Sequence, residues 1–374
     1  AYSRNVCFLP KADIYSIMAL TPYHNTECRV GILTEAAQKV RGRSWWSISG
    51  ALIGAFALGW VLWRVDYGRL QDIIIQANVG FLLLVPLAIA VEQLVRAWKW
   101  RQLLHGILPI GTLRLFGAIM AGYFANILIP LGVSPIVRSW LVARLEELRM
   151  GTVLATAAID RLVDGIIFIG FVVFALGFAV FPDPGGNIRL ALVVGGIGSL
   201  VLFSLLLFAL ARWKNRASHG DGWTARLGAH LPTRFAGPIN GFLQSFNEGI
   251  VWPDEIWRGA GVIIASIGIK LIATTHFLWA GLAFGVVLRP AEYVFLLVFL
   301  GFLIILTRLV RIPGGFLVGG VFALDLLGVA EEQSLAMVLL VHFASLMTIS
   351  TIGAFALWRN GVAIADLRSI KESG

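Results

Sequence analysis

Apolar runs alternate with short polar stretches along most of this chain. Many runs approach the roughly 20 consecutive apolar residues that a helix needs to cross a bilayer. Such runs predict helices, because a spanning helix satisfies its own backbone hydrogen bonds inside the membrane. We therefore expect an all-α, polytopic integral membrane protein with about seven or eight transmembrane helices. The apolar segments have the approximate limits 46–63, 80–95, 112–131, 151–181, 189–211, 259–288, 291–308, 313–329 and 335–358.

Lys and Arg are unevenly distributed among the polar stretches, and this asymmetry predicts an orientation. Basic residues cluster before the first segment, after the second, fifth and seventh, and in the C-terminal tail. The loop 181–187 contains neither Lys nor Arg. Because cytoplasmic loops carry an excess of these residues, we expect both termini in the cytoplasm and the loop 181–187 on the outer side.

Two of the apolar segments, 112–131 and 313–329, contain residues that interrupt helices. Nine complete crossings would leave the termini on opposite sides, so we expect one or two re-entrant helices. Irregular backbone at membrane depth is tolerated only where protein or a water-filled cavity surrounds it. The interruptions are Asn126 and Pro130 in the first segment, and Pro313, Gly314 and Gly315 in the second.

The interrupted segments occupy corresponding places in two halves of the chain. This arrangement is typical of a transporter built from two repeats, whose site lies where the broken elements meet. Two ordinary short helices with proline kinks are the alternative. The predicted organisation is a poorly ordered N-terminal segment 1–44, a transmembrane domain 45–360 with halves at about 45–211 and 259–358, a cytoplasmic connector 212–258 and a cytoplasmic tail 361–374.

The composition bears on one question, which is whether the chain binds membrane lipid or nucleic acid. Only 14% of residues are charged, but the formal net charge is +9. The basic residues stand beside apolar runs, so we assign them to topology and anionic lipid headgroups rather than to nucleic acid. The chain has no Walker A sequence and no metal-ligand spacing, so we expect no ATP, no other cofactor and no metal.

Asp160, Arg161 and Asp164 fall inside an apolar segment, where an ionisable residue costs roughly 3 kcal/mol or more and is usually paired or functional. If the helix begins near residue 151, Asp160 lies about 15 Å along it. Asp160 and Asp164 share a face, and Arg161 is spaced to pair with Asp164. Alternatively the span begins near residue 165 and these charges lie at the interface.

Lys270 and His276 lie far from either end of the segment 259–288. Lys270 needs a counter-charge, for which Asp160 or Asp164 is the natural candidate. Such a pair would form part of a polar track or would only lock two helices together. We interpret His276 as a hydrogen-bonded core residue.

Basic residues also follow the second apolar segment and the first interrupted one. Arg suits bidentate recognition of phosphate, so we assign Arg96 and Arg138 to a lipid headgroup. For Lys99 we favour a role in topology alone. The residues after the second segment are Arg96, Lys99 and Arg101.

Four short motifs, taken in order, resemble a known family. They are Arg96 to Leu104 (RAWKWRQLL), Asn126 to Pro130 (NILIP) with Gly132 and Arg138, the Asp160-Arg161 pair with Asp164, and Arg311 to Gly315 (RIPGG). The chain thereby resembles the flippase-like transmembrane region of lysylphosphatidylglycerol synthases, a family that includes stand-alone, possibly hopanoid-associated members. The resemblance covers roughly residues 45–360.

This resemblance implies a bacterial inner-membrane protein whose re-entrant helices meet at a lipid cavity. It also implies movement of a phospholipid or lipid-like molecule between leaflets. Two acidic positions of the family motifs are absent here, where Ser134-Pro135 and Leu317 to Gly320 stand instead. These departures favour an anionic, neutral or hopanoid-like lipid over a cationic headgroup.

The sequence therefore predicts a lipid translocator rather than an enzyme. The alternatives are a scaffold for lipid-modifying enzymes and an intramembrane lipid or glycosyl transferase. Expected partners are membrane lipids, with a homodimer or a lipid-modifying enzyme as further possibilities. The candidate substrate-binding residues are Arg96, Arg101, Asn126, Pro130, Arg138, Asp160, Arg161, Asp164, Lys270, Arg311, Pro313, Gly314 and Gly315.

Overall fold

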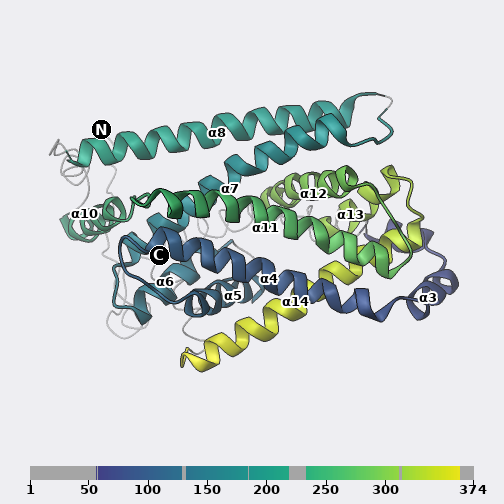
Figure 1. Cartoon of the computed structure of the whole chain (residues 1–374), viewed down its shortest axis with the longest axis horizontal. Coiled ribbons are helices and arrows are strands. Elements are labelled where there is room, and N and C mark those ends of the chain that lie inside the picture. The colour runs from purple at the N-terminus through teal and green to yellow at the C-terminus, as the bar shows by residue number, and fades with distance from the viewer. Residues whose placement is uncertain are drawn as a thin grey trace, which may run out of the picture.

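The computed structural model describes residues 56, 58–128, 132–183, 185–218, 233–310 and 314–362. All regular secondary structure in these ranges is helical (Figure 1). The helices are α3 (Tyr67–Ile75), α4 (Val79–Leu104), α5 (Thr112–Leu128), α6 (Ser134–Leu145), α7 (Met150–Phe178), α8 (Asn187–Ser218), α10 (Thr233–Glu248), α11 (Ile256–Ala283), α12 (Pro290–Val310), α13 (Gly315–Leu326) and α14 (Glu331–Arg359).

Six helices of the described part are long and apolar enough to cross a membrane, namely α4, α7, α8, α11, α12 and α14. The predicted all-α polytopic architecture is thereby confirmed. The apolar helices α5 and α13 have 17 and 12 residues. At ~1.5 Å per residue both are shorter than the ~30 Å hydrocarbon core. Re-entry of these two segments stays a prediction, and most of the first apolar segment lies outside the described residues.

Helix α4 is longer than the sequence pattern indicated. Asn78 caps its start by accepting a hydrogen bond from the Gly80 amide at 3.0 Å, and the helix continues to Leu104. Arg96, Lys99 and Arg101 therefore lie inside a membrane helix, and our assignment of them to a loop after the span was wrong. Local hydropathy ended the segment at residue 95 because it does not record the acidic partners that neutralise Arg96 and Lys99.

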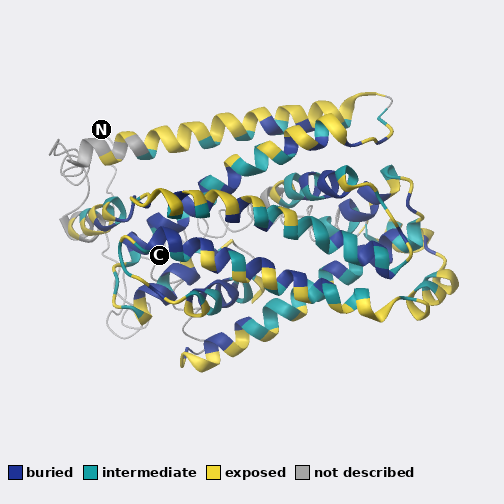
Figure 2. Cartoon of the chain, viewed as in Figure 1, coloured by how far each residue is buried: buried dark blue, intermediate teal, exposed yellow. Residues whose placement is uncertain are grey.

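The helices run mainly along the long axis of the molecule, and α4 and α11 pack side by side in opposite directions (Figure 1). The amide of Asn78 donates to the carbonyl of Ala283 at 3.0 Å, which joins the start of α4 to the end of α11. Helix α8 lies at the edge and packs on α7. Its surface is largely exposed (Figure 2), and the exposed side chains are mostly apolar, as expected of a face that lipid covers.

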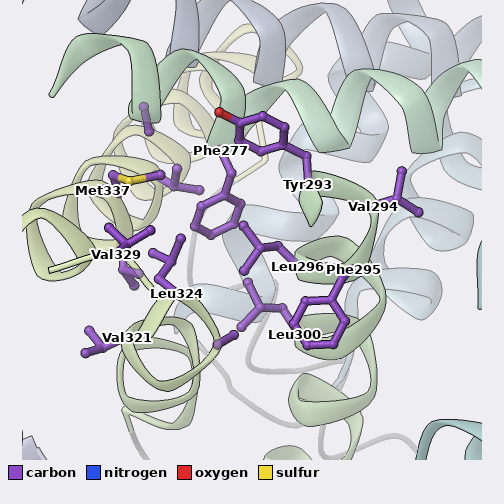
Figure 3. Packing of buried hydrophobic residues seen from close by; sticks show 14 of the residues in the cluster. Phe277, Tyr293, Val294, Phe295, Leu296, Leu300, Val321, Leu324, Val329 and Met337 are labelled. Carbon is purple, nitrogen blue, oxygen red and sulfur yellow. The ribbon is translucent and has the colours of Figure 1, made fainter. Parts of the chain in front are cut away.

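Two apolar cores hold the bundle together. One includes residues of α11, α12, α13 and α14, with Phe277, Leu296 and Leu324 facing one another (Figure 3). The other surrounds α5, α6, the end of α4 and the beginning of α7. The two short apolar helices thus belong to different cores, and they lie toward opposite ends of the bundle in Figure 1. The interruptions at residues 129–131 and 311–313 lie outside the described part of the chain, so the expectation that the two interrupted segments meet at one site stays a prediction.

Helix α10 lies in the predicted connector and packs on α7. The hydroxyl of Thr152 donates to the carbonyl of Ser245 at 2.9 Å. The cytoplasmic placement of this connector and the division into two halves stay predictions. Residues 1–44 and the tail from residue 363 lie outside the described part of the chain.

Candidate functional site

A group of charged side chains lies inside the bundle where α4, α6 and α7 pack together. Each of these side chains is buried inside the protein, and each belongs to a membrane helix or to the short helix α6 beside it. We call this group the ion cluster. Its members are Glu92, Arg96 and Lys99 of α4, Arg138 of α6, and Asp160 and Asp164 of α7.

Asp160 lies at the centre of the ion cluster and has no exposed surface. Its Oδ1 is 2.6 Å from Nζ of Lys99, and its Oδ2 is 3.1 Å from Nη2 of Arg138. Helix α7 begins at Met150, so Asp160 lies about 15 Å along a continuous helix. A helix that begins near residue 151 is therefore confirmed, whereas the position of Asp160 relative to the membrane, and with it the alternative span beginning near residue 165, stays a prediction.

Asp164 joins the two cations of α4. Its Oδ1 is 2.6 Å from Nζ of Lys99, and its Oδ2 accepts from Nη1 of Arg96 at 3.0 Å. Nη2 of Arg96 also donates to Glu92 at 2.8 Å, and Glu92 lies 3.5 Å from Nε2 of His276. Glu92, Arg96 and Lys99 are four and three residues apart on α4, and Asp160 and Asp164 are four apart on α7. Each group therefore lies on one face of its helix, and the two faces can pair.

Arg138 is fully buried, but most of its donors have no partner. Nη2 contacts Asp160 and the carbonyl of Ala157, and the guanidinium stacks 4.6 Å from the ring centre of Trp100. Among the described residues, Nε and Nη1 find no hydrogen-bond partner, and neither do Oγ of Ser134 and Oδ1 of Asn126. Three of the five N–H donors of Arg138 are thus unpaired within the described part of the chain.

The unpaired donors of Arg138 lie at the beginning of a helix. Arg138 is one turn from Ser134, the first residue of α6, and helical side chains lean toward the helix N-terminus. Val133 provides no side-chain cap there. A helix N-terminus carries partial positive charge, so it adds to the attraction that Arg138 exerts on an anion.

Gly122 sets the distance between α5 and α6. A Cβ atom at this position would lie 2.8 Å from the Ser134 carbonyl oxygen and 3.2 Å from Cβ of Arg138. We expect Gly122→Ala to push the helices apart and to lower the free energy of unfolding by roughly 1–3 kcal/mol. Thermal unfolding of the purified protein measures this. Gly198→Ala in α8 is the control, since its Cβ meets nothing within 4 Å, and equal stability of the two variants would contradict the assignment.

Two further predicted residues have different partners from those expected. Nη2 of Arg161 donates to the hydroxyl of Tyr123 at 3.1 Å rather than to Asp164, because Arg161 projects from α7 toward α5. Nζ of Lys270 lies 5.3 Å from the ring centre of Phe168. Among the described residues no carboxylate lies within ion-pair distance of Lys270, and Lys99 is the cation that contacts both aspartates. Asp164 still attracts Lys270 electrostatically, so the predicted counter-charge acts at longer range.

The remaining candidates lie outside the ion cluster. Arg101 points toward Thr112 of α5, where Nη1 and Oγ1 are 3.5 Å apart. Gly314 and Gly315 begin α13, and Gly315 packs closely on Thr307 of α12. Gly315 therefore serves helix packing, whereas Gly314 adopts the left-handed φ of 74° at the N-cap of α13 that glycine allows. Pro130, Arg311 and Pro313 lie outside the described residues.

Sequence reasoning missed three members of the site. Lys99 is not a topology determinant alone, because it is fully buried between two aspartates. Glu92 and Tyr123 were not considered. The signal for Glu92 was available, since Glu92, Arg96 and Lys99 recur at helical spacing and predict a charged stripe on one face.

The ion cluster and its neighbours carry an excess of positive charge. Besides the six members of the cluster, Arg161 of α7 and Lys270 of α11 lie near it. Five cations then stand beside three carboxylates, which leaves two positive charges in excess. This excess of positive charge suits an anionic group. Among the described residues no group of three or more His, Cys, Asp or Glu could hold a metal ion.

Comparisons with known proteins agree with the motifs in the sequence. The family model described as the lysylphosphatidylglycerol synthase TM region matches residues 47–353. No curated protein and no solved structure matches the chain. The family match spans most of the chain, including every member of the ion cluster. This protein therefore belongs to the family of the lysylphosphatidylglycerol synthase transmembrane region.

Proposed function

We propose that this protein moves a phospholipid or lipid-like molecule between the leaflets of a bacterial inner membrane, with both termini in the cytoplasm. The observation that carries the proposal is the ion cluster, with the unpaired donors of Arg138 at its edge. Charged groups inside spanning helices are costly and mark pathways for polar substrates. Membership of the family supports a lipid-related role in the membrane.

The excess of positive charge favours an anionic headgroup such as a phosphate diester. Arg138 would bind a phosphate oxygen through Nε and Nη1, and the beginning of α6 would add its dipole. The acyl chains would remain in the bilayer while the headgroup passes the ion cluster. The carboxylates of Asp160 and Asp164 would keep Arg138, Lys99 and Arg96 in place between passages.

Transbilayer movement in proteoliposomes tests this function. Fluorescent lipids with anionic, zwitterionic and neutral headgroups are reconstituted with the whole chain, and the accessible fraction is followed over time. We expect movement of the anionic lipid well above that in protein-free vesicles. An absence of movement for all three lipids would refute translocation by this chain alone.

One observation favours a second function, that of a scaffold for lipid-modifying enzymes. Lys99 and Asp160 are fully buried and paired with each other, as expected of a cluster that only locks helices. A scaffold predicts that cluster variants lose stability or co-purifying partners without any change in lipid distribution. We also propose that the chain is not itself an enzyme, which conversion of a labelled lipid into a new product would refute.

A further inference from the structure

An apolar groove of about 640 Å³ lies between α7, α11 and the beginning of α12. Its walls include Ile167 and Phe171 of α7 and Ile267 and Thr274 of α11. The hydroxyls of Thr274 and Thr275 donate to the carbonyls of Leu271 and Ile272 in their own helix, at 2.6 and 2.7 Å. The groove therefore presents a largely apolar lining, although two of its residues are threonines and one is Tyr293, whose hydroxyl accepts from the Leu288 amide.

The groove opens on the face of the bundle that meets the bilayer. Ile166 and Phe174 on one wall and Leu271 on the other are 39%, 42% and 51% exposed. Along α11 the lining extends from Ile267 to Leu278, which is about 16 Å at ~1.5 Å per residue. These dimensions suit an extended hydrocarbon chain that enters sideways from the membrane.

Lys270 stands between two residues of the α11 wall of this groove, although it is not itself one of the lining residues. It shares a helix face with Ile267 and Thr274, from which it is separated by three and four residues. Its Nζ lies 5.3 Å from the ring centre of Phe168, one turn before Phe171 of the opposite wall. No carboxylate of the described chain lies within ion-pair distance of Lys270, although nearby carboxylates attract it electrostatically, so a bound anion would stabilise this ammonium within membrane helices.

We propose that this groove binds one acyl chain of an anionic phospholipid and that Lys270 binds its headgroup phosphate. The inference rests on the proposed lipid function and assigns the substrate class and a binding route to it. The headgroup then lies one helical turn from Asp164 and thus beside the ion cluster, since Asp164 and Phe168 are four residues apart on α7. A lipid occupies the groove before its headgroup passes the ion cluster.

Photo-crosslinking tests the site. The whole chain is placed in nanodiscs with phosphatidylglycerol or phosphatidylcholine that carries the same photoactivatable acyl chain, and labelled peptides are identified by mass spectrometry. We expect label in 166–174 and 267–278, with a preference for phosphatidylglycerol. A photoactivatable fatty acid in a third sample distinguishes a phospholipid phosphate from a free carboxylate, and stronger labelling by the fatty acid would overturn the phosphate assignment.

Two glycines of α7 provide a matched pair of variants. Gly170 lines the groove, Gly177 does not, and a Cβ at either position meets nothing within 4 Å. We expect Gly170→Leu to fill the groove and to reduce labelling roughly tenfold, because a leucine side chain displaces the hydrocarbon chain. Gly177→Leu should stay within about twofold of the unaltered protein. Equal labelling of the two variants would overturn the groove as the acyl-chain site.

Lys270→Gln tests the headgroup contact. Removing an unpaired buried cation should not unfold the protein, which thermal unfolding verifies. We expect phosphatidylglycerol labelling to fall roughly tenfold, to the level of phosphatidylcholine, since a hydrogen bond to a charged group is lost. An unchanged preference for phosphatidylglycerol would refute the role of Lys270.

The proposed function and this inference can fail separately. Groove labelling without any lipid movement in proteoliposomes would support the binding site and refute translocation. Lipid movement at the unaltered rate in Gly170→Leu, with no label in the groove, would support translocation and refute the binding site.

Discussion

Replacing Arg138 by lysine is expected to slow lipid translocation roughly ten- to a hundredfold. Lysine keeps a positive charge beside Asp160 but removes the Nε and Nη1 donors, which have no partner among the residues that the structure describes. A hydrogen bond to a charged group contributes about 1.5–3 kcal/mol, and each 1.4 kcal/mol corresponds to a factor of ten. The measurement is the initial rate of movement of a fluorescent anionic lipid in proteoliposomes with equal protein content.

Arg114→Lys provides the matched control for this prediction. Arg114 lies in α5, its side chain is 72% exposed, and it forms a 3.0 Å ion pair with Glu146. An exposed pair of this kind contributes little, so translocation and stability should stay close to those of the unaltered protein. If Arg138→Lys translocates as fast as Arg114→Lys, the unpaired donors of Arg138 do not bind the headgroup, and the scaffold hypothesis gains support.

Replacing Asp160 by asparagine is expected to lower the free energy of unfolding by about 3–5 kcal/mol. The asparagine has nearly the same shape but leaves Arg138 without a carboxylate and Lys99 with Asp164 alone. Removing one partner of a buried pair is costly because the other charge stays buried without compensation. Thermal unfolding in detergent, monitored by circular dichroism, measures the effect.

The control for Asp160→Asn is Glu248→Gln, which removes one partner of an exposed ion pair. Arg149 and Glu248 lie 3.4 Å apart, and their side chains are 64% and 48% exposed. We expect a change of about 1 kcal/mol or less. The double variant Lys99→Met and Asp160→Asn should recover part of the lost stability, because it removes one uncompensated cation. Equal unfolding temperatures for Asp160→Asn and Glu248→Gln would contradict the ion cluster.

The helices were predictable because their signal is local. Each long apolar run within the described residues corresponds to a helix of the structure, as 259–288 does to α11 and 335–358 to α14. The errors occurred where local hydropathy was misleading. Helix α4 continues past residue 95 because its charges have partners on α7, and the pattern within α4 holds no information about those partners.

The site was predictable as a set of residue types but not as an arrangement. Asp160 and Asp164 were identified because charge inside an apolar segment is costly, and Arg96 and Arg138 because arginine suits phosphate recognition. Their pairing was not identified, since Lys99 and Asp164 are 65 residues apart and Arg138 and Asp160 are 22 apart. The same uncertainty led us to pair Lys270 directly with an aspartate, whereas its Nζ lies over Phe168 beside an apolar groove.

The sequence by itself determined that this protein is a polytopic membrane protein of helices, and its motifs indicated the family. Apolar run length and motif order decide these properties, and both can be read along the chain. Only the tertiary structure decided which charges neutralise one another, which donors of Arg138 stay free and where a groove opens beside Lys270. These features depend on how helix faces are rotated and packed, and helices distant in the sequence meet in ways that local hydropathy does not record.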